Sequence, residues 1–469
     1  MSAELWALSA AGLIKQFRTG EATPSRALEA CLARLDEVNP LLNAVVTLDR
    51  QGARQAARQS DERWRAGAPL GPLDGVPVTI KDNIPVAGLR STWGSRLYGE
   101  WIPEKDETPV LRLREAGSVI LGKTNVPEMT LQGYTSNLVF GPTGNPWSPE
   151  LTPGGSSGGA VAAVGSGIGP IALATDGGGS IRRPASHGGL VGLKPTVGRV
   201  PRRDGFPPIL LDFEVIGPLT RTVADLAATM AVISQPDPEA VAASSFGPVT
   251  ALAETGRKRI LFVPIFAGAP VDPEIAASVA EVASRLRALG HHVEDGASFD
   301  LADPINAAWP VIAQTGLAWL MWDQRERLAD LGPDIRAMAE SGARLAATDF
   351  FDALHTALKL RENLAVFFRG FDMILTPTAA ALPWPKNEAY PRVIDGQEVG
   401  PRGSAIFTGF VNAAHLPAIT VPCRPSPAGL PIGFQLIAPW GRDEDLIAIA
   451  GEYEAGHPWP MSWDGGAAA

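Results

Sequence analysis

The feature that most constrains this chain is the run of residues 152–184, in which two serine-glycine clusters flank an apolar segment. The first cluster reads G-G-S-S-G-G and contains Ser156 and Ser157, and the second reads D-G-G-G-S and ends at Ser180. Glycine lets a backbone take positive φ angles or approach a ligand closely, so both clusters are expected to be shaped backbone. We therefore interpret this run as an active site.

Residues 151–175 form an uncharged run that is long enough to suggest a membrane span. Their many glycines and serines, with Pro153 and Pro170, would make a poor lipid-facing helix. We expect buried core instead.

The composition narrows the class of protein. Of the 469 residues, 45% are hydrophobic and 19% charged, which is typical of a globular protein with a large core. The formal net charge of −10 argues against a nucleic-acid or anionic-membrane surface and favours a small neutral substrate. Two cysteines, Cys31 and Cys423, exclude a disulfide framework, and the N-terminal residues lack the basic region of a signal peptide. The expected location is the cytoplasm.

Hydrophobic periodicity predicts alternating strands and helices. Strands are expected near residues 76–80, 119–121, 171–174, 372–376 and 418–422. Helices are expected over residues 24–40, 159–164, 272–290, 301–330, 350–370 and 446–453. This alternation, without internal repeats, predicts one α/β domain. In the first strand, Lys81 falls on the face opposite to Val76, Val78 and Ile80.

The two serine-glycine clusters resemble those of the amidase signature family of serine hydrolases. Four further segments match that family in order and spacing: V-P-V-T-I-K-D-N at 76–83, G-K-T-N-V-P-E at 122–128, F-G-P-T-G-N-P-W at 140–147 and G-L-K-P-T-V-G at 192–198. The resemblance implies a single domain over residues 1–469 with a mixed, twisted central sheet covered by helices on both faces. It places the core signature region at about 70–200 and a more variable cover over the acyl pocket at about 201–376.

The resemblance also implies a catalytic triad of Lys81, Ser156 and Ser180, with no metal and no cofactor. Ser180 would attack the amide carbonyl, and Ser156, after a cis peptide bond, would relay its proton to a neutral Lys81. Burial would supply that neutral amine by lowering the pKa of Lys81.

The remaining site residues support this triad. Successive backbone amides at Gly177, Gly178, Gly179 and Ser180 would hold the oxyanion. We assign Asp176 and Arg182 to holding the loop, and Ser157 and Thr175 to the hydrogen-bond surroundings.

Two other catalytic motifs compete with this interpretation. Residues 117–124 fit the P-loop pattern G-x-x-x-x-G-K-T, but residues 118–121 are apolar and β-prone and would spend their amides in a sheet. The sequence around Ser156 fits the G-x-S-x-G elbow of α/β-hydrolase esterases, which needs a preceding strand that is absent here and a late histidine such as His415 or His457. His187, seven residues after Ser180, is expected to be packed or bound to a partner group.

The predicted activity is hydrolysis of a small carboxylic amide, or of a related carbamate or ester, through an acyl-Ser180 intermediate. The alternative within the family is the glutaminase subunit of an amidotransferase complex. Those subunits usually read M-G-S-S-x-E-x-S where this chain has L-Q-G-Y-T-S-N at 131–137, and His415 stands where glycine is commoner. Aromatic residues at 309–322 and 350–368 hint at an aryl or hydrophobic acyl group. A non-catalytic binding protein is the remaining class, and the sequence leaves a homodimer open.

Overall fold

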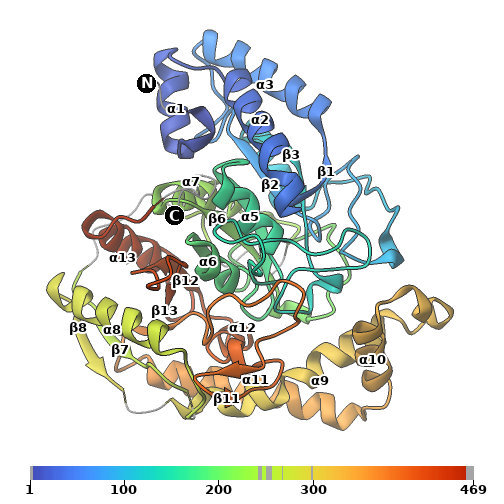
Figure 1. The fold of residues 1–469 in the computed structure, drawn as a ribbon, viewed down its shortest axis with the longest axis vertical. Coiled ribbons are helices and arrows are strands. Elements are labelled where there is room, and N and C mark those ends of the chain that lie inside the picture. The colour runs from blue at the N-terminus through green and yellow to red at the C-terminus, as the bar shows by residue number, and fades with distance from the viewer. Residues whose placement is uncertain (1–3, 241–245, 250–255, 267, 297–298, 461–469) are drawn as a thin grey trace.

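A single mixed sheet forms the centre of the molecule (Figure 1). The structure is a computed structural model that describes residues 4–240, 246–249, 256–266, 268–296 and 299–460. Within these ranges the sheet has eleven strands in the order β1-β3-β2-β4-β6-β5-β12-β13-β9-β7-β8. The strands are β1 (Val45–Leu48), β2 (Pro77–Lys81), β3 (Val119–Thr124), β4 (Ile171–Asp176), β5 (Val191–Lys194), β6 (Val215–Thr220), β7 (Arg259–Phe262), β8 (His292–Asp295), β9 (Met373–Pro377), β12 (Ala418–Pro422) and β13 (Gly433–Ile437). The short strands β10 (Val393–Ile394) and β11 (Gln397–Glu398) pair separately.

The parallel direction of β2 and β4 brings the carboxyl ends of these two strands together at one edge of the sheet. Strand β2 runs parallel to both β3 and β4, whereas the strands from β4 to β9 pair antiparallel in their sheet order. Because β2 and β4 are parallel neighbours, their carboxyl ends lie side by side. Lys81 and Thr175 therefore meet at this edge.

Helices cover both faces of the sheet. In β4, Ile171 and Leu173 belong to the cluster that contains Leu226 of α7, whereas Ala172 and Ala174 pack with α5 and α6. The helices are α1 (Ala10–Thr19), α2 (Pro24–Leu42), α3 (Arg50–Arg65), α4 (Thr108–Glu115), α5 (Gly158–Ser166), α6 (Arg182–Gly188), α7 (Val223–Ile233), α8 (Pro273–Ala288), α9 (Asp303–Leu320), α10 (Pro333–Gly342), α11 (Ala347–Phe367), α12 (Gly409–Ala413) and α13 (Asp443–Gly456). The predicted α/β architecture is confirmed.

Helix α5 is pressed against the sheet because its first two residues, Gly158 and Gly159, carry no side chains. A Cβ at Gly159 would lie 2.3 Å from the amide nitrogen of Asn125 and 2.7 Å from the carbonyl oxygen of Ala44. Real Cβ atoms do not approach backbone that closely, so glycine is required here. This approach sets the serines before α5 over the ends of β2 and β4.

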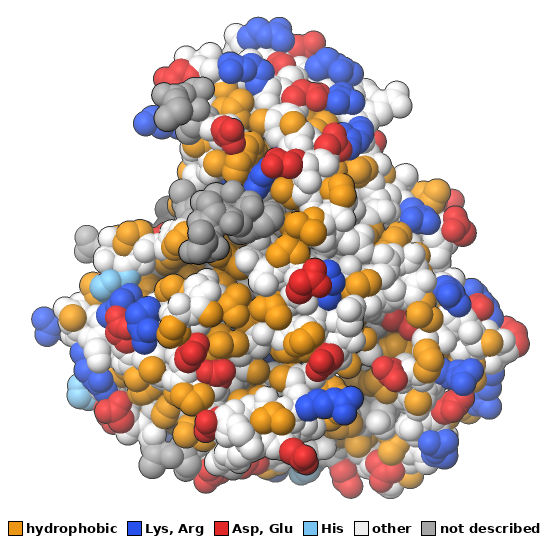
Figure 2. All heavy atoms as spheres, viewed as in Figure 1, with side chains coloured by type: hydrophobic (Ala, Val, Ile, Leu, Met, Phe, Trp, Pro, Cys, Tyr) orange, Lys and Arg blue, Asp and Glu red, His pale blue; other side chains and the backbone are white. Residues whose placement is uncertain are grey.

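The uncharged run at 151–175 became buried core, as predicted: it forms most of α5 and β4. Within the part of the chain that the structure describes, no helix combines the length and apolar character needed to cross a bilayer. On the face shown in Figure 2, acidic and basic side chains are interspersed.

Two predicted boundaries were wrong. The helix expected to stop at Asn39-Pro40 runs on to Leu42, because a proline removes only one backbone donor and Asn43 N still donates to Asn39 O. The stretch 301–330 is not one helix, since α9 ends at Leu320 and a 3-10 turn follows at Arg325–Asp330.

The region expected to cover the site, about 201–376, also supplies β6, β7 and β8 to the central sheet.

Candidate active site

The side chain of Lys81 joins the two serine-glycine clusters. Its Nζ donates to Ser156 Oγ at 2.8 Å, to Thr175 Oγ1 at 2.9 Å and to the carbonyl oxygen of Thr175 at 3.2 Å. Asn83 donates to the same Thr175 hydroxyl at 3.1 Å. Lys81, at the end of β2, is thus held by Ser156 of the first cluster and by Thr175, which directly precedes the second.

Burial also gives Lys81 a proton affinity that suits a general base. Its side chain is fully buried, and burial lowers its pKa to about 7, against the opposing attraction of Glu214 and Asp176. A lysine with this pKa is substantially neutral near pH 7 and can accept a proton there.

Ser156 follows a cis peptide bond after Gly155, as the family resemblance implied. A Cβ at Gly155 would lie 2.6 Å from the carbonyl oxygen of Tyr134 and 2.8 Å from that of Gln132. The neighbouring Ser157 donates to the carbonyl oxygen of Thr175 at 3.3 Å. The first cluster is therefore clamped between the 132–134 segment and the end of β4.

The second cluster is shaped by a buried ion pair. Arg182 donates through Nη2 to Asp176 Oδ1 at 2.9 Å and through Nε to Oδ2 at 3.0 Å, and both side chains are fully buried. Although burial opposes ionisation of Asp176, the Arg182 guanidinium and a hydrogen bond from Asn412 hold the pKa of that carboxyl well below its usual range. The charged carboxylate then fastens the loop by accepting from the amides of Gly179 and Ile181.

This fastening removes one amide from the predicted oxyanion donors. The amide of Gly179 donates to Asp176 Oδ1 at 2.7 Å and so is engaged. Within the described ranges, the amides of Gly177, Gly178 and Ser180 have no acceptor. The carbonyl of Gly178 is turned away by the hydroxyl of Thr408, which donates to it at 2.8 Å. Three free donors therefore remain in the loop.

Ser180 stands at the end of this loop. Its side chain is 7% exposed, and its hydroxyl has no hydrogen-bond partner in the residues that the structure describes. A partly accessible, unengaged hydroxyl beside free amides has the arrangement that a nucleophile needs.

The histidines are engaged elsewhere. His187 Nε2 lies 3.1 Å from the carbonyl oxygen of Ala381, its ring packs edge-on against Trp384, and burial lowers its pKa to about 4. His415 contacts Arg361 at 2.6 Å and Asp212 at 3.3 Å. Ser156 is bonded to Lys81 rather than to a histidine, and the residues before it form no strand, unlike an α/β-hydrolase elbow.

The P-loop pattern is a strand, as expected. Residues 119–124 form β3, and Lys123 Nζ donates to the carbonyl oxygens of Ile84 and Asp82 and to Ser91 Oγ at 2.7, 3.2 and 2.6 Å. Lys123 is a structural residue.

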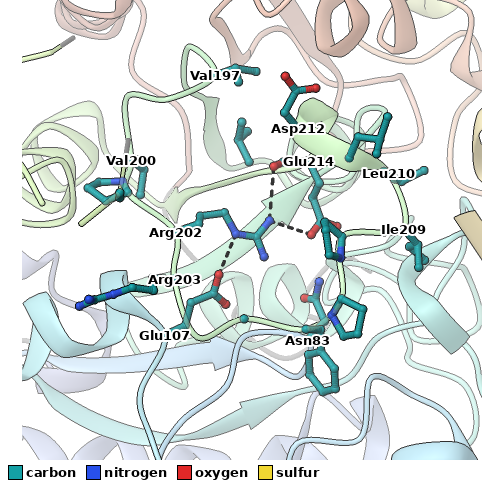
Figure 3. Close-up of a pocket in the computed structure, with 18 of the residues that line it drawn as sticks. Asn83, Glu107, Val197, Val200, Arg202, Arg203, Ile209, Leu210, Asp212 and Glu214 are labelled. Carbon is teal, nitrogen blue, oxygen red and sulfur yellow. Dashed lines mark hydrogen bonds and ion pairs between the residues drawn. The ribbon is translucent and has the colours of Figure 1, made fainter. Parts of the chain in front are cut away.

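A cavity of about 440 Å³ adjoins the site (Figure 3). Asn83 belongs to both, and Leu210 and Glu214 of the cavity wall lie against Gly177. At its centre Arg202 donates to Glu107 at 2.7 Å and to Glu214 at 2.9 Å. The cavity therefore lies on the side of the free Gly177 amide.

Of the aromatic residues that hinted at an aryl pocket, Trp309 lies against the loop formed by residues 177–180. Its ring would be 3.2 Å from a Cβ at Gly178 and stacks on Phe213 with centroids 5.9 Å apart. Trp319, Trp322 and Phe351 are instead 56%, 62% and 71% exposed.

Several supporting residues were missed by sequence reasoning. Asn83 was within reach, because it follows Lys81 in the motif V-P-V-T-I-K-D-N. Arg182 also contacts Thr408, Gln435 and Asn412, which lie 226, 253 and 230 positions further along the chain, and no local pattern marks them.

Comparisons with known proteins identify the family and the fold. The family model described as Amidase matches residues 26–447. The chain is 34% identical to an acylamidase of Rhodococcus erythropolis over 462 residues, covering 96% of both proteins. It is likewise 34% identical to a glutamyl-tRNA(Gln) amidotransferase subunit of Synechococcus sp. strain CC9605, covering 94% of both.

A solved structure of a bacterial aryl acylamidase of the amidase signature family superposes with a TM-score of 0.89 at 28% identity, covering 98% of this chain and 99% of that one. The fold and sequence thus define a hydrolase of carbon-nitrogen bonds with an α/β fold. The chain belongs to the amidase signature family.

Proposed function

We propose that this chain hydrolyses small carboxylic amides through an acyl-Ser180 intermediate, with Lys81 as the base and Ser156 as the proton relay. The observation that carries the proposal is the 2.8 Å hydrogen bond between Lys81 Nζ and Ser156 Oγ in a fully buried setting that lowers the pKa of Lys81 to about 7. An uncharged amine held against a serine hydroxyl is a general base in working position.

In the acylation step, Ser180 Oγ attacks the amide carbonyl and gives its proton to Ser156, which passes its own proton to neutral Lys81. The relay then runs backwards: the Lys81 ammonium returns a proton through Ser156 to the leaving nitrogen. An amide needs this return, because an amine leaves poorly without a proton. Water repeats the sequence on the acyl-Ser180 ester.

The negative charge of the tetrahedral intermediate is assigned to the free amides of Gly177, Gly178 and Ser180. They need no reorganisation during the reaction, because the Asp176–Arg182 pair already holds the loop. The engaged Gly179 amide contributes to the shape of the loop rather than to the oxyanion site.

A second candidate is a glutaminase subunit of an amidotransferase, since relatives of that kind cover 94% of this chain at 34% identity. The segment L-Q-G-Y-T-S-N at 131–137 departs from the pattern usual in those subunits. We favour a stand-alone amidase for this reason.

A turnover screen tests the proposal. Purified protein is given aryl amides, aliphatic amides, amino-acid amides, carbamates and L-glutamine, and release of amine or ammonia is followed. We expect steady turnover of at least one amide without a partner protein, and labelling of Ser180 by a fluorophosphonate probe. Failure of every substrate, together with an unlabelled Ser180, would contradict the proposal. Turnover of glutamine alone would favour the glutaminase.

A further inference from the structure

Two consecutive arginines follow the loop, and they differ in what they contact. Arg182 is bonded to Asp176, Gln435 and Thr408. The side chain of Arg183 is only 9% exposed, yet within the described residues it has no ion pair and no hydrogen bond, and its Nε is fully buried without an acceptor. Burying a guanidinium without a partner is unfavourable, so this side chain needs an explanation.

Arg183 lies beside the proposed nucleophile. Its amide donates to the carbonyl oxygen of Gly179 at 2.9 Å, which makes this turn helical and puts the side chains of residues 180 and 183 on one side. Its Nε lies 2.8 Å from the position of a Cβ at Gly179, and its Nη1 lies 2.9 Å from that position at Gly133. The guanidinium therefore sits between the loop that carries Ser180 and the segment packed on Gly155.

A second unpaired arginine, Arg402, approaches the same loop from the turn that precedes the 3-10 helix Gly403–Ala405. Arg402 lies over Trp309, with its Cζ 5.5 Å from the ring centroid, and Trp309 packs on Gly178. Its Nη2 is buried without an acceptor and lies 2.9 Å from the Cβ position of Gly409, next to Thr408, whose hydroxyl bonds to Gly178. In the described residues its side chain has no carboxylate partner.

Within the residues that the structure describes, neither guanidinium is bonded to a carboxylate, and the nearby charge of Asp176 only partly offsets the burial that lowers the pKa of Arg183. Burial lowers the pKa of Arg183 to about 10, and burial together with the charge of Arg183 lowers the pKa of Arg402 to about 10. The carboxylate of Asp176 is already saturated by Arg182, Asn412 and two backbone amides. A bound anion would satisfy both guanidinium groups.

We propose that Arg183 and Arg402 form a carboxylate-binding subsite beside Ser180, so that the preferred substrates are amides that carry a carboxylate. The inference rests on the proposed amidase function and names its substrate class. A guanidinium presents paired N–H donors that match the two oxygens of a carboxylate. The indole of Trp309 lies against the guanidinium of Arg402 and adds a cation–π contact.

The carboxylate could belong to the acyl half or to the amine half of the substrate, and matched substrates separate these sources. For the acyl half, succinamate is compared with butyramide and adipamate with hexanamide, since each pair exchanges a carboxylate for a methyl group. For the amine half, N-acetyl-β-alanine is compared with N-propylacetamide. We expect kcat/KM to be at least about 10-fold higher for the carboxylated member in one of the two arms.

Variants then assign the preference to the two arginines. Arg183→Met should reduce the ratio of carboxylated to neutral kcat/KM by about 10- to 100-fold, mostly through KM, and Arg402→Met should reduce it in the same direction. Arg183→Lys should recover part of the ratio. Arg336→Met is the matched control, because Arg336 is exposed on α10 and pairs with Glu340, and it should leave the ratio unchanged.

Binding gives a readout that does not depend on turnover. Calorimetric titration of Ser180→Ala with succinamate, adipamate and N-acetyl-β-alanine should show saturable binding of one of them, and Arg183→Met in that background should weaken it. A wild-type ratio of one or below in both arms would overturn the subsite, as would a ratio that neither arginine variant changes. If neutral amides are hydrolysed through Ser180 without a carboxylate preference, only this inference fails. If no amide is hydrolysed, the proposed function fails, and the titration still decides the subsite.

Discussion

Two segments of this molecule match catalytic motifs, and they differ in whether their backbone amides are hydrogen-bonded. Residues 117–124 end in G-K-T and residues 176–180 in G-G-G-S. In the first segment the chain from Val119 onward is strand β3, paired on both sides with β1 and β2. In the second, strand β4 stops at Asp176, and three of the next four amides have no acceptor in the described part of the chain. Only the second segment keeps donors available for a substrate.

The glycines of the two segments serve different purposes. Gly122 takes a φ of +156°, and a Cβ there would lie 2.1 Å from the carbonyl oxygen of Thr47, so this glycine permits close pairing of β1 with β3. The loop of Gly177 to Gly179 is instead fastened by the side chains of Asp176 and Thr408. The lesson is that a motif acquires chemical meaning from what its backbone amides are bonded to.

The lysines of the two regions extend the comparison. Lys81 and Lys123 are both fully buried at the ends of neighbouring strands, and burial lowers their pKa values to about 7 and about 8. Lys123 faces two carbonyl oxygens and Ser91, whereas Lys81 faces the hydroxyl of Ser156. Both lysines thus contact a serine hydroxyl, but that of Ser91 donates to the carbonyl oxygen of Leu89, whereas Ser156 belongs to the first serine-glycine cluster.

The largest effect on activity is expected for Ser180, at the end of the loop formed by residues 177–180. Ser180→Ala should lower kcat by about 10⁵-fold, since no other hydroxyl lies at the end of the free amides, while the unfolding temperature stays near that of the wild type. Steady-state turnover and a thermal melt check both points. Wild-type turnover in this variant would remove Ser180 from the mechanism.

The next effect concerns the base. Since neutral Lys81 is the active form, kcat/KM should rise with pH through about 7 and be lost toward acid. Lys81→Arg should reduce kcat/KM by about 10³-fold and abolish this limb, because arginine stays protonated over the whole range. A pH profile of both proteins gives the answer. Near-normal turnover of the arginine variant with the same profile would show that Lys81 is not the base.

The matched variant in the P-loop-like segment, Lys123→Met, should lower stability rather than activity. Lys123→Met removes the donors to three buried acceptors and should lower the free energy of unfolding by about 1–3 kcal/mol. The kcat/KM of the folded fraction should remain within about 3-fold of wild type. Denaturant unfolding and active-site titration measure the two quantities. A loss of activity as deep as that of Lys81→Arg, without loss of stability, would break the comparison.

The smallest effect is an expected absence of binding. Millimolar ATP with magnesium should not shift the unfolding temperature, because the amides around Gly122 belong to the sheet. A saturable shift that Lys123→Met removes would restore the nucleotide interpretation.

Much of the fold could be predicted because its strands carry strong local signals. Strand β12 lies at the predicted residues 418–422, and β4 was predicted to within two residues. The strand order could not be predicted, since it depends on pairings such as β4 with β6 that join distant segments. The helix end at Leu42 was missed because Asn39 both accepts from Asn43 and bonds the chain at Val45, which a proline rule does not weigh.

In the site, too, some features could be predicted from local motifs and others could not. The meeting of Lys81, Ser156 and Thr175 was foreseen because three motifs carry these residues. The engagement of the Gly179 amide was not, because it depends on the side-chain orientation that Arg182 and Asn412 impose on Asp176. Arg183 carried no signal either, since only its surroundings distinguish it from Arg182.

In the proposed mechanism, Ser180 attacks the carbonyl and Ser156 relays the proton. Quenching the wild-type enzyme in the first turnover of a slow aryl amide or carbamate, and locating the acyl group by mass-spectrometric fragmentation, distinguishes the two roles. We expect an acyl group on Ser180, still on Ser180 but formed more slowly in Ser156→Ala, and absent from Ser180→Ala. An acyl group on Ser156 would contradict this mechanism.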